Sequence, residues 1–240
     1  MTDRVVALTG AGRGLGLITT RILLDQGMTV VANHRSPSPD LVRRQDKHPD
    51  ALHLVPGDVG EEETAEALAR RAKEIGGLDV LICNAGIAKD QPLVTTPARD
   101  WDEVHRVNLR GAFLATKHAL RQMMRRRYGR IVYVSSLAAV QGNPGQAIYA
   151  ASKAGLHGLS STVAQEYGGY NVRSVVVAPG LLDTGLGAAL APEVAQRKID
   201  RALLGLGGAE GVAATIAFLA GPDADYINNT VIRADGGLAY

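Results

Sequence analysis

Three residues have the types and the spacing needed to move a proton to or from a carbonyl oxygen. Tyr149 is followed four residues later by Lys153, and Ser136 lies thirteen residues before Tyr149. Residues four apart on a helix share a face, so the Lys153 ammonium would favour the phenolate and lower the Tyr149 pKa from about 10 towards neutrality. A general acid works best near the working pH. Since Tyr-x-x-x-Lys also occurs on solvated helix faces, the rest of the chain has to support this reading.

A glycine-rich string near the N-terminus is expected to position a second reactant. Residues 4–9 are apolar and β-prone, residues 10–16 read Gly-Ala-Gly-Arg-Gly-Leu-Gly, and a helical pattern follows. A strand, a glycine loop and a helix in this order present backbone N–H groups to a phosphate. The pattern predicts a dinucleotide-binding loop, with a glycine-rich turn that binds no ligand as the alternative.

Apolar runs and helical periodicity alternate along all 240 residues. The length suits one domain, and we expect an α/β fold of the Rossmann type, with a doubly wound parallel sheet of about seven strands and helices on both faces. Pro37 and Pro39 predict a short or irregular second helix. Residues 181–207 are interpreted as a substrate lid, or equally as ordinary surface helices. Strands are expected near 4–9, 28–33, 51–55, 79–83, 130–135, 172–178 and 230–234, and helices over 15–26, 61–75, 98–127, 147–168 and 209–220.

Several segments, in the same order along the chain, carry a family resemblance. Together they resemble the short-chain dehydrogenases/reductases, from residue 5 to residue 237. The segments are Thr9–Gly16, Cys83–Gly86, Val107–Leu109, Ser135–Ser136, Tyr149–Gly155, Pro179–Gly180 with Thr184, and Asp235–Gly237. Within that family the chain most resembles the 3-oxoacyl-[acyl-carrier-protein] reductases.

The resemblance implies a site in which a hydride and a proton are transferred to a ketone. Tyr149 is expected to give the proton, Ser136 to orient the ketone oxygen, Lys153 to assist Tyr149, and Asn108 to position a water or to serve a structural role. Ser135 is the rival to Ser136. The residues expected to bind the cofactor are Gly10, Gly12, Arg13, Gly14, Leu15, Gly16, His34, Arg35, Ser36, Asp58, Val59, Asn84, Ala85, Gly86, Tyr149, Lys153, Pro179, Gly180 and Thr184.

The end of the second expected strand indicates which cofactor is used. An NAD enzyme of this fold usually carries Asp or Glu there for the ribose 2′-hydroxyl, whereas residues 30–36 contain no carboxylate. Arg35 stands in its place and Arg13 is a second candidate, and guanidinium groups bind phosphate bidentately. We therefore predict NADP(H). By resemblance Asp58 contacts the adenine ring, with Val59 packed beside it, although Asp58 could instead cap the helix beginning near Glu61.

The substrate is predicted less closely than the chemistry. The resemblance implies a 3-oxoacyl thioester on acyl carrier protein, for fatty-acid or polyketide-type synthesis, with Arg127 and its neighbours near the active-site mouth contacting the carrier. Tyr170 departs from the Arg of the family at the second carrier position. A solvated helix end is the alternative for the Arg run. A free ketone, sugar or steroid remains an alternative substrate, and a non-catalytic NADP-sensing protein is a third hypothesis.

Composition limits the partners and the compartment. The net charge of +2 does not suggest nucleic acid, and no metal site is expected. The chain has one cysteine, no apolar signal region and no stretch approaching the roughly 20 apolar residues of a membrane span. A cytoplasmic protein without a membrane partner is therefore expected. By resemblance to the family, we predict a homotetramer.

Overall fold

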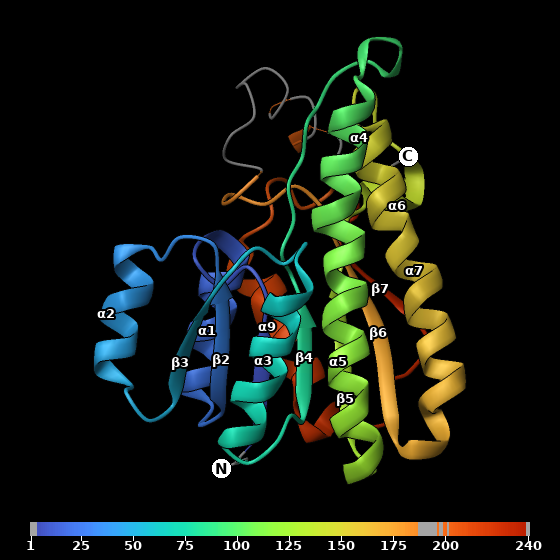
Figure 1. The fold of residues 1–240 in the computed structure, drawn as a ribbon. Coiled ribbons are helices and arrows are strands. Elements are labelled where there is room, and N and C mark those ends of the chain that lie inside the picture. Colours follow the sequence, from blue (N-terminus) through green and yellow to red (C-terminus); the bar gives the residue numbers. More distant parts are fainter. Residues whose placement is uncertain (1–3, 187–195, 197–198, 201, 239–240) are drawn as a thin grey trace.

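Seven short apolar strands form one parallel sheet in the computed structural model, which describes residues 4–186, 196, 199–200 and 202–238 (Figure 1). The strand order is β3-β2-β1-β4-β5-β6-β7. Central strands are buried throughout, as parallel strands covered on both faces must be. The predicted Rossmann-type fold is confirmed. The strands are β1 (Val5–Leu8), β2 (Thr29–His34), β3 (Leu52–Pro56), β4 (Val80–Cys83), β5 (Gly129–Val134), β6 (Val172–Pro179) and β7 (Val231–Ala234).

Helices cover both faces of the sheet and create two apolar cores. On one face α1 (Gly14–Asp25) packs against α9 (Ala209–Ala220), and their core includes Leu23 and Ile216. On the other face lie α3 (Glu62–Glu74), α5 (Gly111–Arg126) and α7 (Ala147–Tyr167), with Met123 and Tyr133 fully buried beneath them. This two-sided cover explains why the strands read as continuous apolar runs.

Pro39, the second of the two prolines after β2, begins a helix. In α2 (Pro39–Lys47) the Ser38 side chain accepts a hydrogen bond from the Leu41 main-chain N–H at 3.2 Å. Proline suits the first helical position because its missing N–H would be unpaired there. The helix is short, as predicted, at nine residues.

The predicted helix over 98–127 is in fact three elements. Between α4 (Ala98–His105) and α5 lies a π-helical turn, η2 (Arg106–Arg110). Such wide turns inside a helix often lie at functional sites. Here the turn contains Asn108, whose side chain is turned towards the loop after β4.

The chain reverses its direction across the sheet between β1 and β4. From β1 it moves outward to β2 and β3, then crosses back to β4 beside β1. In an open α/β sheet, ligands bind outside the carboxyl ends of the strands at this switch point. The glycine loop follows β1, and the Asn84 segment follows β4, so both lie at that place.

The segment predicted as a lid is described only in part. Leu182 forms a bridge with Gly207, and Ala202 forms one with Leu238. Residues 187–195, 197–198 and 201, which include Leu190, lie outside the described residues. In the part of the chain that the structure describes, no helix combines the length and the hydropathy needed to cross a bilayer.

Candidate active site

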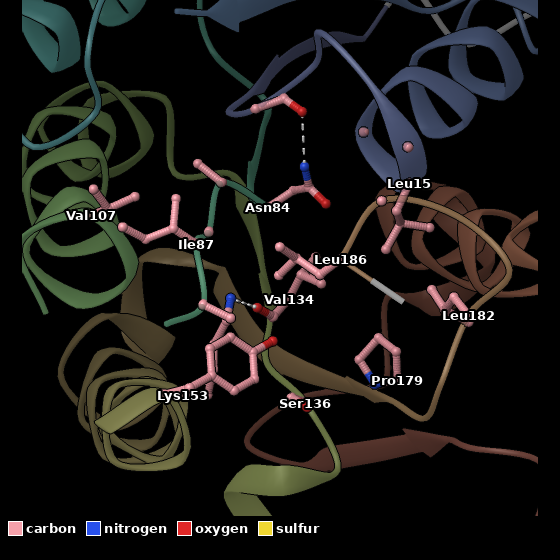
Figure 2. A pocket seen from close by; sticks show the side chains of 18 of the residues that line it. Leu15, Asn84, Ile87, Val107, Val134, Ser136, Lys153, Pro179, Leu182 and Leu186 are labelled. Carbon is pink, nitrogen blue, oxygen red and sulfur yellow. Dashed lines mark hydrogen bonds between the residues drawn. The ribbon is translucent and has the colours of Figure 1, made fainter. Parts of the chain in front are cut away.

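One cavity of about 1030 Å³ opens at the carboxyl ends of the strands (Figure 2). It is at the upper end of the size range of small-molecule sites, which suits a large ligand. All the residues predicted to bind the cofactor line it, and so does Ser136. Of the predicted site residues, Asn108 alone is absent from the lining, since it lies behind the loop that follows β4.

The glycine loop is held against the segment after β4 by a set of short hydrogen bonds. The Thr9 hydroxyl accepts from the main-chain N–H groups of Asn84 and Ala85 at 3.0 and 3.1 Å. The Asn84 amide donates back to the main-chain oxygens of Thr9 and Gly10 at 3.0 and 3.1 Å (Figure 2). At Gly10, with φ of +70°, a Cβ atom would lie 2.9 Å from the Ala85 Cα. Glycine at this position therefore allows the two segments to touch.

A buried residue that the sequence did not single out supports the same loop. Asn33 is buried, at 1 % exposure, and its Nδ2 donates to the main-chain oxygens of Val55 and Gly57. Its Oδ1 accepts from the Gly10 N–H at 3.5 Å. It therefore links the glycine loop to β3. Further along, a Cβ at Gly16 would approach the Gly10 carbonyl oxygen to 2.2 Å, so α1 can begin close beneath the loop only with glycine there.

Ser136 and Tyr149 face each other in the cavity from different elements. Ser136 follows β5, and its hydroxyl also accepts from the Ala138 N–H at 3.2 Å at the start of α6 (Ala138–Gln141). Tyr149 lies in the first turn of α7 and is 9 % exposed. Burial raises the pKa of Tyr149, and a hydrogen bond between the Ser136 and Tyr149 side chains opposes that rise.

Lys153 is buried one helical turn beyond Tyr149. Its Nζ donates to the main-chain oxygen of Val134 at 2.8 Å and lies 6.0 Å from the Tyr149 ring centroid (Figure 2). Burial lowers the pKa of Lys153 to about 8. The prediction that Lys153 lowers the Tyr149 pKa towards neutrality is wrong for this arrangement, because burial disfavours both the ammonium and the phenolate. The site instead holds a Tyr149 phenol that keeps its proton.

The Asn108 side chain makes hydrogen bonds that join three elements. Its Oδ1 accepts from the Ile87 N–H at 2.8 Å, and its Nδ2 donates to the Ile87 carbonyl at 2.9 Å and to the Ser152 hydroxyl at 3.0 Å. These bonds join the π-helical turn, the loop after β4 and α7. The structural role that the sequence left open is therefore present, and a water role for Asn108 stays a prediction.

Asp58 lies at the end of the cavity predicted for the adenine. Its two carboxylate oxygens accept from the Gly60 N–H and from Arg106, each at 2.8 Å. The hydrogen bond from Arg106 holds the pKa of Asp58 below its usual value, with a smaller contribution from nearby Arg35. The alternative in which Asp58 caps the next helix is wrong. The Asp58 side chain accepts from the Gly60 N–H, and the N-cap residue of α3 is Glu61.

The arginine run lies where α5 ends and β5 begins, at the opposite end of the sheet from the loops that follow the strands (Figure 1). It joins the end of α5 to the start of β5, whereas Ser136 follows the carboxyl end of β5. Arg127 donates to the Gly169 carbonyl at 2.9 Å and stacks over the Tyr170 ring. Arg126 pairs with Asp79. The expectation that this cluster borders the active-site mouth is wrong within one chain, because residues before a parallel strand and residues after it lie at opposite edges.

Several lining residues were missed by the sequence analysis. Asp90 and Gln146 meet in a 2.7 Å hydrogen bond, although 56 residues separate them in the chain. Gln146 flanks the start of α7, three residues before Tyr149, and this closeness in the chain was the one available signal. Other unpredicted lining residues are Asn33, Ile87, Ala88, Gln141, Asn143, Pro144 and Leu238.

Comparison with known proteins accounts for this geometry. The family described as short chain dehydrogenase matches residues 4–195. The chain belongs to this family. It is therefore an oxidoreductase of the short chain dehydrogenase type, built to use a nicotinamide cofactor.

Curated relatives and a solved structure extend the match over the full length. The 3-oxoacyl-[acyl-carrier-protein] reductase FabG of Thermotoga maritima is 38% identical, over 99% of this chain and 98% of its own. Nodulation protein G of a Rhizobium species is 35% identical, over 100% and 98%. The crystal structure of levodione reductase superposes with a TM-score of 0.92 at 32% identity, over 99% of this chain and 98% of that one.

Proposed function

We propose that the chain is an NADPH-dependent reductase that converts a 3-oxoacyl thioester, carried on acyl carrier protein, into the 3-hydroxyacyl thioester. The observation that carries this proposal is the half-buried Ser136 facing the buried Tyr149 beside Lys153, inside a cavity built for a dinucleotide. Reductases of the FabG kind, at 32–38% identity over nearly the whole chain, support the substrate class.

The roles of the residues follow from where charge develops. A bound nicotinamide supplies hydride to the ketone carbon, which leaves negative charge on the ketone oxygen. Tyr149, which burial keeps protonated, donates its proton to that oxygen. Ser136 donates a hydrogen bond to the same oxygen and orients it, and donors that are in place before the charge develops cost no reorganisation. Lys153 holds the ribose hydroxyls of the cofactor.

The residues around the adenosine end favour the 2′-phosphate of NADP(H). Arg13 and Arg35 are exposed guanidinium groups on the lining of the cavity. His34 is buried at 6 % exposure, and its Nδ1 has no hydrogen-bond partner among the described residues. A cationic pair beside an unsatisfied ring nitrogen fits an added phosphate, and the end of β2 offers no carboxylate to repel it.

A second candidate is the reduction of a free ketone, with the same cofactor. The structural match to levodione reductase favours this reading, and so does the distance between the arginine run and the cavity within one chain. The apolar lining residues Leu181, Leu182 and Leu186 accommodate either substrate.

Initial rates of NADPH oxidation test the proposal. The substrates are a 3-oxoacyl group on acyl carrier protein, the same group on a small thiol, and a simple ketone, with NADH in parallel. A strong preference for the carrier-bound substrate supports the first candidate, whereas turnover of free ketones alone favours the second. Tyr149→Phe must abolish turnover and keep cofactor binding. If Tyr149→Phe remains active, the assigned mechanism is overturned.

We further propose a cytoplasmic homotetramer. The outer side of α4 and α5 exposes Trp101 at 45% and Phe113 at 48%, and the edge strand β7 exposes Val231 at 39%. Large apolar side chains on adjacent helices and at a sheet edge suit contacts between copies. Light scattering tests this, and a monomer mass would contradict it.

A further inference from the structure

A chain of three polar side chains runs along one wall of the cavity. The Asn143 amide donates to the Gln146 Oε1 at 2.7 Å, and the Gln146 Nε2 donates to the Asp90 carboxylate at 2.7 Å. All three residues line the cavity. Gln146 is 9 % exposed, so its amide is fixed by partners on both sides.

The loop that carries Asp90 is attached to the same wall by its backbone. The Gln91 N–H donates to the Gly145 carbonyl at 2.8 Å, immediately beside the Asp90–Gln146 bond. The neighbouring Lys89 is engaged elsewhere, since its ammonium pairs with Asp100 at 2.7 Å and with Glu103. Among the described residues, the Asp90 carboxylate therefore meets an amide.

This carboxylate acts on the reacting end of the cavity. Gln146 flanks the N-terminus of α7, three positions before Tyr149 in the first turn, and both side chains line the cavity. Asp90 and Tyr149 line the same cavity, and the negative charge of Asp90 makes a small contribution to the raised pKa of Tyr149, after burial. Across the cavity, Pro179 and Leu182 lie opposite Ile87 and Lys153 (Figure 2). A substrate therefore has an apolar wall on one side and an acidic, amide-supported wall on the other.

We propose that Asp90, held in place by Gln146, is a specificity-determining residue that rejects free 3-oxo acids and admits their neutral esters and thioesters. This rests on the proposed reduction of 3-oxoacyl groups. In a 3-oxo acid the carboxylate carbon is two bonds from the ketone carbon, so it is brought to the same end of the cavity, where Asp90 repels it. A neutral thioester carbonyl meets no such repulsion. Its oxygen can accept a hydrogen bond from the second N–H of the Gln146 amide.

The test compares acetoacetate with its N-acetylcysteamine thioester and its ethyl ester, using NADPH and purified full-length protein. We expect Asp90→Asn to raise the ratio of kcat/KM for acetoacetate over kcat/KM for the thioester at least about threefold, because the like-charge repulsion is removed. Asp90→Glu, which keeps the charge, should leave that ratio within about threefold of the wild type. Asp223→Asn, on the exposed turn after α9, controls for loss of a carboxylate elsewhere.

Two failures can be told apart. If the wild type oxidises NADPH with none of the three compounds, the proposed function fails. If the neutral compounds react and Asp90→Asn leaves the ratio within about threefold of the wild type, only this inference is overturned. If Asn at this position impairs folding, Asp90→Ser also removes the charge, and the same ratio of kcat/KM values is measured with that variant.

Discussion

The Lys153 ammonium and the main-chain carbonyl of Val134 are joined by a 2.8 Å hydrogen bond across the base of the active site. The bond ties α7 to the last residue of β5, two residues before Ser136. It thereby fixes the distance between the element that carries Tyr149 and the element that carries Ser136. A single hydrogen bond satisfies one of the three ammonium protons, so the charge remains costly to bury.

Replacing Lys153 should change how the stability of the protein depends on pH. Burial lowers the folded pKa of Lys153 to about 8, against its ordinary value of 10.5. The unfolded chain therefore holds the extra proton between these values, and stability rises with pH across that window. Relative to Lys153→Met, the wild type should gain about 2 kcal/mol of unfolding free energy from about pH 7.5 to about pH 10. Urea unfolding at both pH values measures this gain.

The exposed Lys73→Met variant is the matched control, since it removes an ammonium from the surface of α3. It should keep the pH dependence of the wild type. A difference between Lys153→Met and the wild type that stays constant across the window would contradict the buried, penalised ammonium.

Tyr149 should keep its proton well above neutral pH in the protein without cofactor. Burial is the main cause of its raised pKa, with the Asp90 charge adding to it, and the Ser136 hydrogen bond only partly opposes them. The ultraviolet absorbance of tyrosinate, taken as wild type minus Tyr149→Phe, should therefore appear only above about pH 10. A difference signal with a midpoint near neutrality would refute this, and would restore the expectation drawn from the spacing of Tyr149 and Lys153.

The cofactor proposal predicts a selective loss of affinity. Arg35→Ala should weaken NADPH binding about 10- to 100-fold, as a charge-assisted phosphate contact worth about 1.5–3 kcal/mol is removed. NADH binding should change little, since NADH lacks the 2′-phosphate. Isothermal titration calorimetry measures both dissociation constants without turnover. Arg99→Ala, whose side chain is 86% exposed on α4, controls for loss of a surface cation. Equal losses for both cofactors would exclude a phosphate role for Arg35.

Local pattern and chain order predicted most of this molecule, and the departures have physical reasons. Strand bounds are local, and the seven expected strands agree with the structure within two residues at each end. The π-helical turn at Arg106–Arg110 depends on Asn108 binding Ile87, a contact across 21 residues that periodicity does not contain. The pKa direction at Tyr149 depends on burial, which the spacing of Tyr149 and Lys153 does not give.

The position of the arginine run was available from the sequence. Arg127 precedes the fifth strand and Ser136 follows it, and a six-residue strand spans about 20 Å. The expectation that the cluster borders the active-site mouth followed the family resemblance and did not take this strand length into account. The Asp90–Gln146 contact, by contrast, required the structure, since neither residue belongs to a motif that places it near the other.

The two adjacent serines should separate into a structural residue and a catalytic one. Ser135 is buried, and its hydroxyl donates to the Lys153 carbonyl at 3.0 Å and accepts from the His157 Nε2 at 2.9 Å. Ser135→Ala removes both hydrogen bonds and leaves the His157 Nε2 without this partner, so it should lower the unfolding free energy by about 1–3 kcal/mol, with a small effect on kcat. Ser136→Ala should lower kcat about 10²- to 10³-fold, as loss of an oxyanion donor does.

Urea unfolding and steady-state rates on the same preparations test this separation. Ser136→Ala should lose at most about 1 kcal/mol of unfolding free energy, because the main-chain hydrogen bond that it removes is the one from the Ala138 N–H. Ser161→Ala, at a partly exposed position on α7, provides the reference for removing a hydroxyl from that helix. The opposite result, a stable but inactive Ser135→Ala beside an active Ser136→Ala, would exchange the roles of the two serines. The roles differ because the two hydroxyls point in different directions. The Ser135 hydroxyl is hydrogen-bonded to α7, whereas the Ser136 hydroxyl is hydrogen-bonded to Tyr149 in the cavity.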